Sequence, residues 1–247
     1  MRVSVKNNRT WTQAASFTEA LAPLIKPKTK IALVGSGGKT SIIMRLAEEQ
    51  KALGKKVLVL TTTHMYAPKR YGVFTGLPAD IEASLQADGI VIAGKETDCG
   101  KITWIGGALY NAAAAMADII LIEADGSKRL PMKFPNGHEP VIPPDIDVIL
   151  SVSGLSAIGL PGNEACHRWS LARQVLNISG DDEILKPEHL SILMREGYLT
   201  PLKKKYPSAR VIPIFNQADN RALSDIGKKI IDELKPERGI VSTMLPF

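Results

Sequence analysis

The sequence predicts an α/β fold of three layers, in which a mostly parallel sheet is covered by helices on both faces. Runs made only of apolar residues, such as 31–34 and 57–60, are typical of strands that are buried on both faces. Stretches with helical periodicity separate these runs. A glycine-rich turn joins the first run to a helix, so residues 31–60 form one strand–loop–helix–strand unit.

The other elements continue this alternation along the chain. Ser16 and Glu19 form a capping-box pattern, which predicts a short helix that ends by Pro27. The helix after the glycine-rich turn should end near Gly54. Further buried strands are expected at 119–122, 148–152, 211–215 and around 240–241, with a helix at 225–234 before the last of them.

Residues 64–117 follow a less regular pattern, with several Gly and Pro residues. We expect 89–93 to form a strand of the sheet and a hairpin near 102–107 to decorate its edge. The alanines at 112–115 should belong to a helix. No linker divides the chain, so we predict a single domain over residues 1–247 with an insertion at about 64–117.

The composition is that of an ordinary globular protein: of 247 residues, 45% are hydrophobic and 23% are charged, with a net charge of +6. The basic run 203–205 lacks interleaved aromatics, so we interpret it as a surface turn and expect no nucleic acid partner. No apolar stretch approaches the roughly 18 residues of a membrane helix, and no signal peptide is visible. The cysteines, Cys99 and Cys166, lack metal-ligand spacing, and a cytoplasmic location is expected.

The glycine loop, residues 35–40, carries the clearest chemical signal. Gly35, Ser36, Gly37 and Gly38 let backbone N–H groups converge on a phosphate, and the following helix adds its positive N-terminal end. Lys39 would neutralise the outer phosphates, Thr40 would bind Mg²⁺, and Ser41 would complete the site. This pattern predicts ATP or GTP binding and a three-layer P-loop NTPase-like fold.

The loop is shorter than the standard G-x-x-x-x-G-K-[ST] pattern, because Leu33 stands where the first glycine would be. It resembles the short loop of the Mur-type ATP-dependent ligases. This resemblance implies ligase or kinase chemistry as an alternative to simple hydrolysis.

Two acids follow the strand predicted at 119–122. Glu123 and Asp125 project to the same side of an extended chain, so both are expected to reach a metal held beside Thr40. Mg²⁺ favours one or two carboxylates together with phosphate oxygens. We therefore predict Thr40, Glu123 and Asp125 as metal ligands.

Further polar residues follow other strand ends. Glu139 or His138 could orient an attacking water or accept a substrate proton, although His138 could equally be a hydrogen-bonded loop residue. Thr62 and Thr63 follow the strand at 57–60 and suit phosphate or metal-bound water; the alternative is simple β-propensity.

Asn216 and Asp219 resemble the N-K-x-D element that binds guanine, but Gln217 replaces its lysine. A plain helix-start turn is the alternative for this segment. For the cluster at 166–169 we predict a packed Trp169 with His167 and Arg168 at the surface, where the arginine could reach a phosphate.

Together these motifs resemble the YqeC family of selenium-dependent hydroxylase accessory proteins. The residues that carry the resemblance are 34–40, 61–64, 123–127, 130–133, 138–143 and the pair 167–168. They span roughly residues 30–170, and 123–143 is the most specific run. The resemblance implies a role in maturing molybdenum hydroxylases that carry labile selenium, with the hydroxylase or its cofactor as partner.

Three hypotheses follow. In the first, the chain is a nucleotide-hydrolysing accessory factor that uses the residues named above. In the second, it is a small-molecule kinase or ATP-dependent ligase that needs an acceptor. In the third, it is a non-catalytic scaffold that changes partners with the bound nucleotide.

Overall fold

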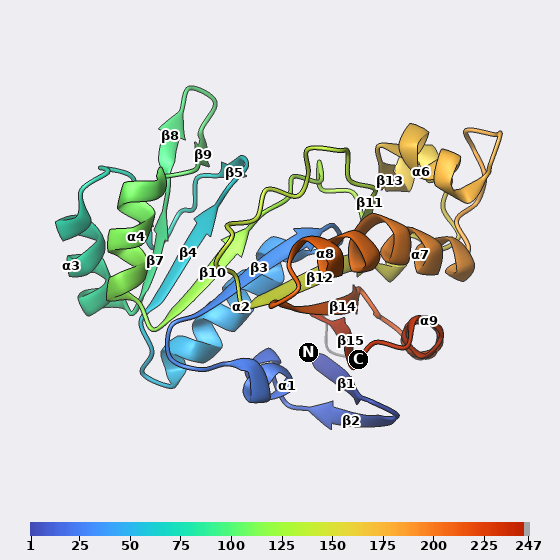
Figure 1. The fold of residues 1–247 in the computed structure, drawn as a ribbon, viewed down its shortest axis with the longest axis horizontal. Helices are drawn as coiled ribbons and strands as arrows, with labels where there is room; N and C mark the ends of the chain where they lie inside the picture. Colours follow the sequence, from blue (N-terminus) through green and yellow to red (C-terminus); the bar gives the residue numbers. More distant parts are fainter. Residues whose placement is uncertain (245–247) are drawn as a thin grey trace.

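The computed structural model describes residues 1–244 and contains a ten-stranded sheet with helices on both faces. The strand order is β2-β1-β15-β14-β12-β3-β10-β4-β7-β6, and β1 alone runs in the opposite direction to the other strands. The strands of this sheet are β1 Arg2–Asn7, β2 Thr10–Ala14, β3 Thr29–Gly35, β4 Val57–Thr61, β6 Gly72–Val73, β7 Ile90–Ala93, β10 Ile119–Glu123, β12 Val148–Gly154, β14 Arg210–Asn216 and β15 Arg238–Thr243. The predicted fold class is confirmed (Figure 1).

The helices are divided between the two faces of the sheet (Figure 1). Leu58 and Leu60 of β4 face the apolar cluster beneath α3, α4, α7, α8 and α9, whereas Val57 and Val59 face the cluster beneath α1 and α2. The helices are α1 Phe17–Leu21, α2 Lys39–Ala52, α3 Pro78–Asp88, α4 Gly107–Met116, α5 Gly162–Ala165, α6 Trp169–Leu176, α7 Pro187–Met194, α8 Thr200–Lys205 and α9 Arg221–Leu234, with a π-helical turn at Arg195–Leu199 and 3-10 turns at Ala22–Leu24 and Leu155–Ala157.

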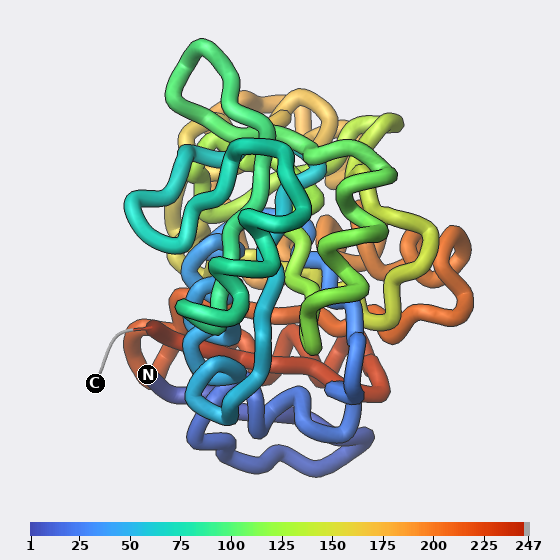
Figure 2. The backbone as a smooth tube through the Cα atoms, turned by 90° about the vertical axis from the view of Figure 1, so that its left-hand side faces the viewer, coloured from blue at the N-terminus to red at the C-terminus, as the bar shows by residue number. Residues whose placement is uncertain are grey.

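Two small sheets lie beside the main one. One pairs β11 (Met132–Lys133) with β13 (Cys166–His167), and the other contains β5 (Met65–Tyr66), β9 (Lys101–Thr103) and β8 (Lys95–Thr97). The hairpin β8–β9 projects from the end of the molecule where the parallel strands finish (Figure 2). Both small sheets therefore lie at the carboxyl edge of the main sheet, where ligands of such folds bind.

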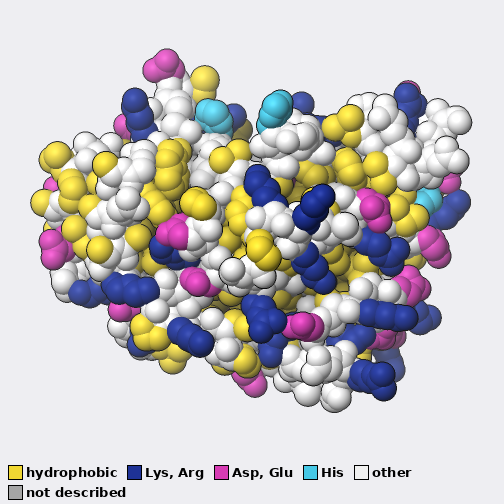
Figure 3. Space-filling model, in the orientation of Figure 1, with side chains coloured by type: hydrophobic (Ala, Val, Ile, Leu, Met, Phe, Trp, Pro, Cys, Tyr) yellow, Lys and Arg dark blue, Asp and Glu magenta, His cyan; other side chains and the backbone are white. Residues whose placement is uncertain are grey.

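Three details differ from the sequence predictions. The hairpin lies over 95–103 rather than near 102–107, because Gly106 adopts φ +87° and caps the start of α4. The basic run 203–205 forms the last turn of α8, where cations favour the helix dipole, rather than a turn. Figure 3 shows Lys and Arg side chains gathered over this helix. The N-terminal strands β1 and β2 were not predicted.

Among residues 1–244, no helix is long and apolar enough to cross a membrane.

Candidate functional site

The glycine loop connects β3 to α2 and packs against the end of β12. Gly35 adopts φ +87°, and a Cβ atom there would lie 2.1 Å from the carbonyl oxygen of Val152. Gly37 has φ +80°, and a Cβ atom would lie 2.3 Å from the nitrogen of Gly154. Only glycine fits both positions, so the loop sequence is dictated by close contact with the neighbouring strand.

Asn216, at the end of β14, fixes the loop from the other side. Its side-chain nitrogen donates to the carbonyl oxygen of Gly37 at 2.8 Å, while its oxygen accepts from Ser242 at 2.9 Å. Asn216 is buried, and the carboxylate of Asp219 accepts from the Thr243 hydroxyl. This arrangement holds the loop rather than offering Asn216 to a nucleotide base.

Three polar side chains meet at the start of α2. The Lys39 ammonium lies 2.7 Å from the carbonyl oxygen of Gly35 and 3.3 Å from the Ser127 hydroxyl. The Thr40 hydroxyl donates to Glu123 Oε2 at 2.7 Å, and Glu123 Oε1 lies 4.0 Å from Lys39 Nζ. Lys39 and the Thr40–Glu123 pair thus lie together at the N-terminus of α2, at the carboxyl edge of the sheet.

Burial lowers the pKa of Lys39, although the nearby carboxylates of Glu123 and Asp125 oppose that shift. The folded chain therefore bears the cost of a buried ammonium group. An anionic ligand beside this ammonium would compensate for that cost.

Asp125 lies directly behind the loop and is fully buried. Its carboxylate accepts hydrogen bonds from the Gly35 N–H at 3.0 Å and the Tyr198 hydroxyl at 3.0 Å, and it forms an ion pair with Lys133. Burial raises the pKa of Asp125, while Lys133 and Lys39 act in the opposite direction. Its oxygens are occupied by these donors, so the geometry does not support the prediction that Asp125 binds a metal directly.

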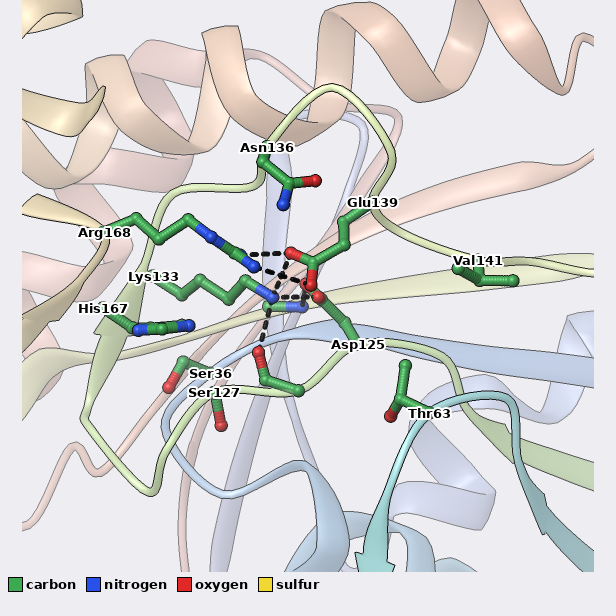
Figure 4. A network of polar contacts seen from close by, with 12 residues as sticks. Ser36, Thr63, Asp125, Ser127, Lys133, Asn136, Glu139, Val141, His167 and Arg168 are labelled. Atoms are coloured by element: carbon green, nitrogen blue, oxygen red, sulfur yellow. Dashed lines mark hydrogen bonds and ion pairs between the residues drawn. The ribbon is translucent and has the colours of Figure 1, made fainter. Parts of the chain in front are cut away.

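A second carboxylate extends this network toward β13 (Figure 4). Glu139 accepts hydrogen bonds from the two terminal guanidinium nitrogens of Arg168, one of them at 2.9 Å, and it lies 2.6 Å from Lys133 Nζ. Burial alone would raise the pKa of Glu139, but these hydrogen bonds from Arg168 and Lys133 outweigh it and lower the pKa. Glu139 is therefore ionised at neutral pH and held in one orientation.

The loop opens into a cleft of about 970 Å³. Several of the predicted site residues line it, namely Gly37, Gly38, Lys39, Thr40, Ser41, Thr63, Glu123 and Glu139. Other side chains that line it are those of His64, Met65, Tyr66, Lys101, Ser127, Lys128, Arg129, Leu130, His167 and Gln217.

Other predicted residues lie outside this cleft lining. Thr62 donates its hydroxyl to the carbonyl oxygen of Val141 at 2.6 Å. His138 is exposed, and its backbone N–H donates to the side chain of Asn136 at 2.9 Å. Ser36 donates its hydroxyl to the carbonyl oxygen of Leu130, which ties the loop to the segment after β10.

A known protein family matches the segment of the chain that contains the glycine loop and most of these motifs. The YqeC protein family matches residues 31–170, which is more than half of the chain. The chain belongs to the YqeC family. It is also 36% identical to the uncharacterized protein YqeC of Escherichia coli (strain K12) over 163 residues, which make up 63% of this chain and 64% of that protein. The match thus spans slightly less than two thirds of this relative.

The YqeC family segment contains the glycine loop, β10 and the Lys133–Glu139–Arg168 network, but it ends before two residues that hold the site together. Asn216 and Tyr198 both come from the C-terminal third of the chain. No sequence signal identified Tyr198, because it lies 73 residues from Asp125 and in a π-helical turn. A buried tyrosine needs a partner for its hydroxyl, but the sequence does not show which one.

The cluster at 166–169 is only partly as predicted. Trp169 is buried, as expected, but His167 lines the cleft and Arg168 is engaged by Glu139 rather than free at the surface. Arg168 also adopts φ +64°, at the start of α6. The ion pair with Glu139 holds this arginine inside the site, and the left-handed backbone conformation at Arg168 directs its side chain there.

Acid is expected to destabilise the fold through His167. Burial, together with the cations of Arg168, Lys133 and Lys128, lowers its pKa from 6.5 to about 4. The unfolded chain binds this proton more tightly, so the free energy of unfolding should fall as pH drops from 6.5 toward 4. We expect His167→Gln to flatten this dependence, measured as the thermal unfolding midpoint between pH 7 and about 5. The exposed His138→Gln should keep the wild-type slope, and equal slopes in both variants would contradict this assignment.

Proposed function

We propose that the chain is a Mg²⁺-dependent nucleoside triphosphatase or phosphoryl-transfer enzyme that acts as a maturation factor for a selenium-dependent molybdenum hydroxylase. The observation that carries the proposal is the meeting of Lys39, Thr40 and Glu123 at the start of α2, inside the cleft. Backbone N–H groups, the helix dipole and an ammonium group at one point favour a polyphosphate.

The residues present fit a magnesium ion. The Thr40 hydroxyl and Glu123 carboxylate provide two oxygen ligands 2.7 Å apart. Within residues 1–244, no group of three or more His, Cys, Asp or Glu side chains could hold a metal, so phosphate and water oxygens would complete the coordination. Mg²⁺ favours such a site over an all-protein cage, and the bound ion would neutralise phosphate charge.

The ionised Glu139 supports a reaction at the phosphate. It lines the same cleft, and its two cationic partners fix its orientation. A carboxylate held in this way could accept a hydrogen bond from an attacking water or substrate hydroxyl. Its lowered pKa makes it a weak base, so we expect it to orient the attacking group more than to remove its proton.

The role in hydroxylase maturation is what the resemblance to the YqeC family implies, and the family match over residues 31–170 supports membership of that family. The partner would be the molybdenum hydroxylase or its cofactor. Transfer to a second substrate is the main alternative to hydrolysis, and it is favoured by the part of the cleft that extends beyond the loop.

Removal of the Thr40 hydroxyl should separate magnesium-dependent binding from simple phosphate binding. We expect calorimetry to detect Mg·ATP or Mg·GTP binding by the wild type, and Thr40→Val to weaken it by about tenfold, or about 1.4 kcal/mol. Without magnesium the two proteins should bind alike. Thr12→Val on β2, which removes a hydroxyl far from the cleft, is the matched control. If the wild type binds neither nucleotide, the proposed function is wrong.

A further inference from the structure

We propose that the cleft contains a second binding site, for a small molecule that carries a carboxylate or phosphate group, between the segment 126–130 and the small sheet of β5 and β9. The site rests on the proposed function only in that the nucleotide would occupy the loop beside it. Its key residues are Tyr66, Lys101, Lys128 and Arg129, with His64 and His167 at its sides.

The first observation is an excess of unpaired cations. The two acids of the cleft lining are already engaged, Glu123 by Thr40 and Glu139 by Lys133 and Arg168. Lys101, Lys128 and Arg129, by contrast, form no ion pair with any residue in the described part of the chain. Like charges that converge without a counter-charge repel one another, and a bound anion would remove that repulsion.

The second observation is that Tyr66 gathers two of these cations at one place. The guanidinium carbon of Arg129 lies 4.5 Å from the centre of the Tyr66 ring, and Lys101 Nζ lies 5.3 Å from it. Tyr66 is 58% exposed, so it is not held there by burial in the core. Cation–π contacts of this kind orient a guanidinium group without neutralising it. Arg129 therefore keeps its donors available for a carboxylate or phosphate.

The third observation concerns the two sides of the cleft. In the sheet, β14 lies two strands from β3 on one side, and β4 lies two strands from β3 on the other. Gln217 follows β14, whereas β5 and Tyr66 follow β4. The glycine loop thus lies in the middle of the cleft, and Lys101 and Arg129, which both contact Tyr66, are on the β4 side. A nucleotide with its phosphates on the loop and its base toward Gln217 would leave that side open.

His167 adds hydrogen-bonding capacity without adding charge. Its pKa of about 4, caused by burial and the neighbouring cations, leaves the ring neutral at physiological pH. A neutral imidazole can both donate and accept, so it can contact a hydroxyl or a carboxyl of the ligand. The combination of unpaired cations, an exposed aromatic ring and a neutral imidazole suits a small polar anion.

The histidine rings provide a direct readout of this site. The chain has four histidines, of which His64 and His167 line the cleft and His138 and His189 do not. With the loop saturated by Mg²⁺ and a non-hydrolysable ATP analogue, inorganic phosphate and succinate are titrated separately while the ring protons are followed by NMR. We expect one or both anions to shift the His64 and His167 signals in a saturable way. Sodium chloride at equal ionic strength should leave them in place.

Variants of the cations decide whether these residues bind the anion. We expect the double variant Lys101→Gln/Arg129→Gln to weaken anion binding by about tenfold or more, because two charge-assisted contacts are lost. Its affinity for the ATP analogue should stay within about twofold of wild type. The control Lys203→Gln/Lys204→Gln, on the last turn of α8, should bind the anion as wild type does.

Three results would overturn the second site. The first is that neither anion causes saturable shifts. The second is that the midpoint of the anion titration is the same in the double variant as in the wild type. The third is that the double variant loses as much affinity for the ATP analogue as for the anion, which would assign these cations to the nucleotide. Titration of Lys39→Met without nucleotide tests the site separately from the proposed function. If the ATP analogue does not bind the wild type but the anions still shift the histidine signals of Lys39→Met, the proposed nucleotide site is wrong and the second site stands.

Discussion

Replacement of Lys39 by methionine is expected to lower nucleotide turnover by about 10²- to 10³-fold, the loss typical when one preorganised donor to a developing charge is removed. Methionine keeps most of the apolar stem but lacks the ammonium group that lies at the start of α2. Release of phosphate from Mg·ATP and Mg·GTP would be measured side by side. Lys55→Met, which changes an exposed lysine after α2, is the matched control.

The same variant should not lose stability. Burial lowers the pKa of Lys39 in the folded chain, so at neutral pH its charged form is disfavoured by folding. Removal of the charge should leave the thermal unfolding midpoint unchanged or raise it, a pattern expected where stability is sacrificed for function. Turnover in Lys39→Met equal to wild type would exclude hydrolysis at this loop. A large drop in the unfolding midpoint would show that Lys39 has a structural role instead.

The main sheet was predictable because strands buried on both faces are uniformly apolar, as 57–60 is. The N-terminal pair β1 and β2 was not predicted. The edge strand β2 is short and mostly exposed, so it carries no apolar pattern. The inner strand β1 buries Ser4 and Lys6 as well as Val3 and Val5, so it lacks the uniformly apolar run that marks the other buried strands. The hairpin was misplaced by a few residues because Gly106 and Gly107 suggested a turn, whereas they begin a helix.

The candidate site, like the fold, was predictable only in part. The residues of the glycine loop are contiguous, so their meeting follows from the strand–loop–helix pattern alone. The partners that hold the loop are remote, as Asn216 and Tyr198 are, and sequence spacing does not report such contacts. Asp125 was singled out as a metal ligand because it shares a strand end with Glu123. Its burial behind the loop depends on contacts that only the fold reveals.

The buried ion pair between Lys133 and Asp125 is expected to be the most sensitive point of the fold. Both side chains are fully buried, and Lys133 also contacts Glu139 and the carbonyl oxygen of Gly126. Lys133→Met should lower the free energy of unfolding, measured by urea denaturation, by about 3–5 kcal/mol, because it leaves an unpaired carboxylate in the interior. The loop should loosen as well, since Asp125 holds the N–H of Gly35.

The sign of the pH dependence distinguishes an unpaired charge from a packing defect. Burial already raises the pKa of Asp125, and loss of Lys133 would raise it further above the unfolded value of 3.8. The destabilisation of Lys133→Met should therefore grow as pH rises above 3.8 and shrink as pH falls toward that value, because protonation of Asp125 removes the buried charge. The double variant Lys133→Met/Asp125→Asn should recover part of the lost stability at neutral pH, because it leaves no buried carboxylate at position 125. Lys133→Met could instead lose the same free energy of unfolding at every pH, with no recovery in the double variant. Lys133 would then stabilise the fold by packing, and its charge would not position the loop.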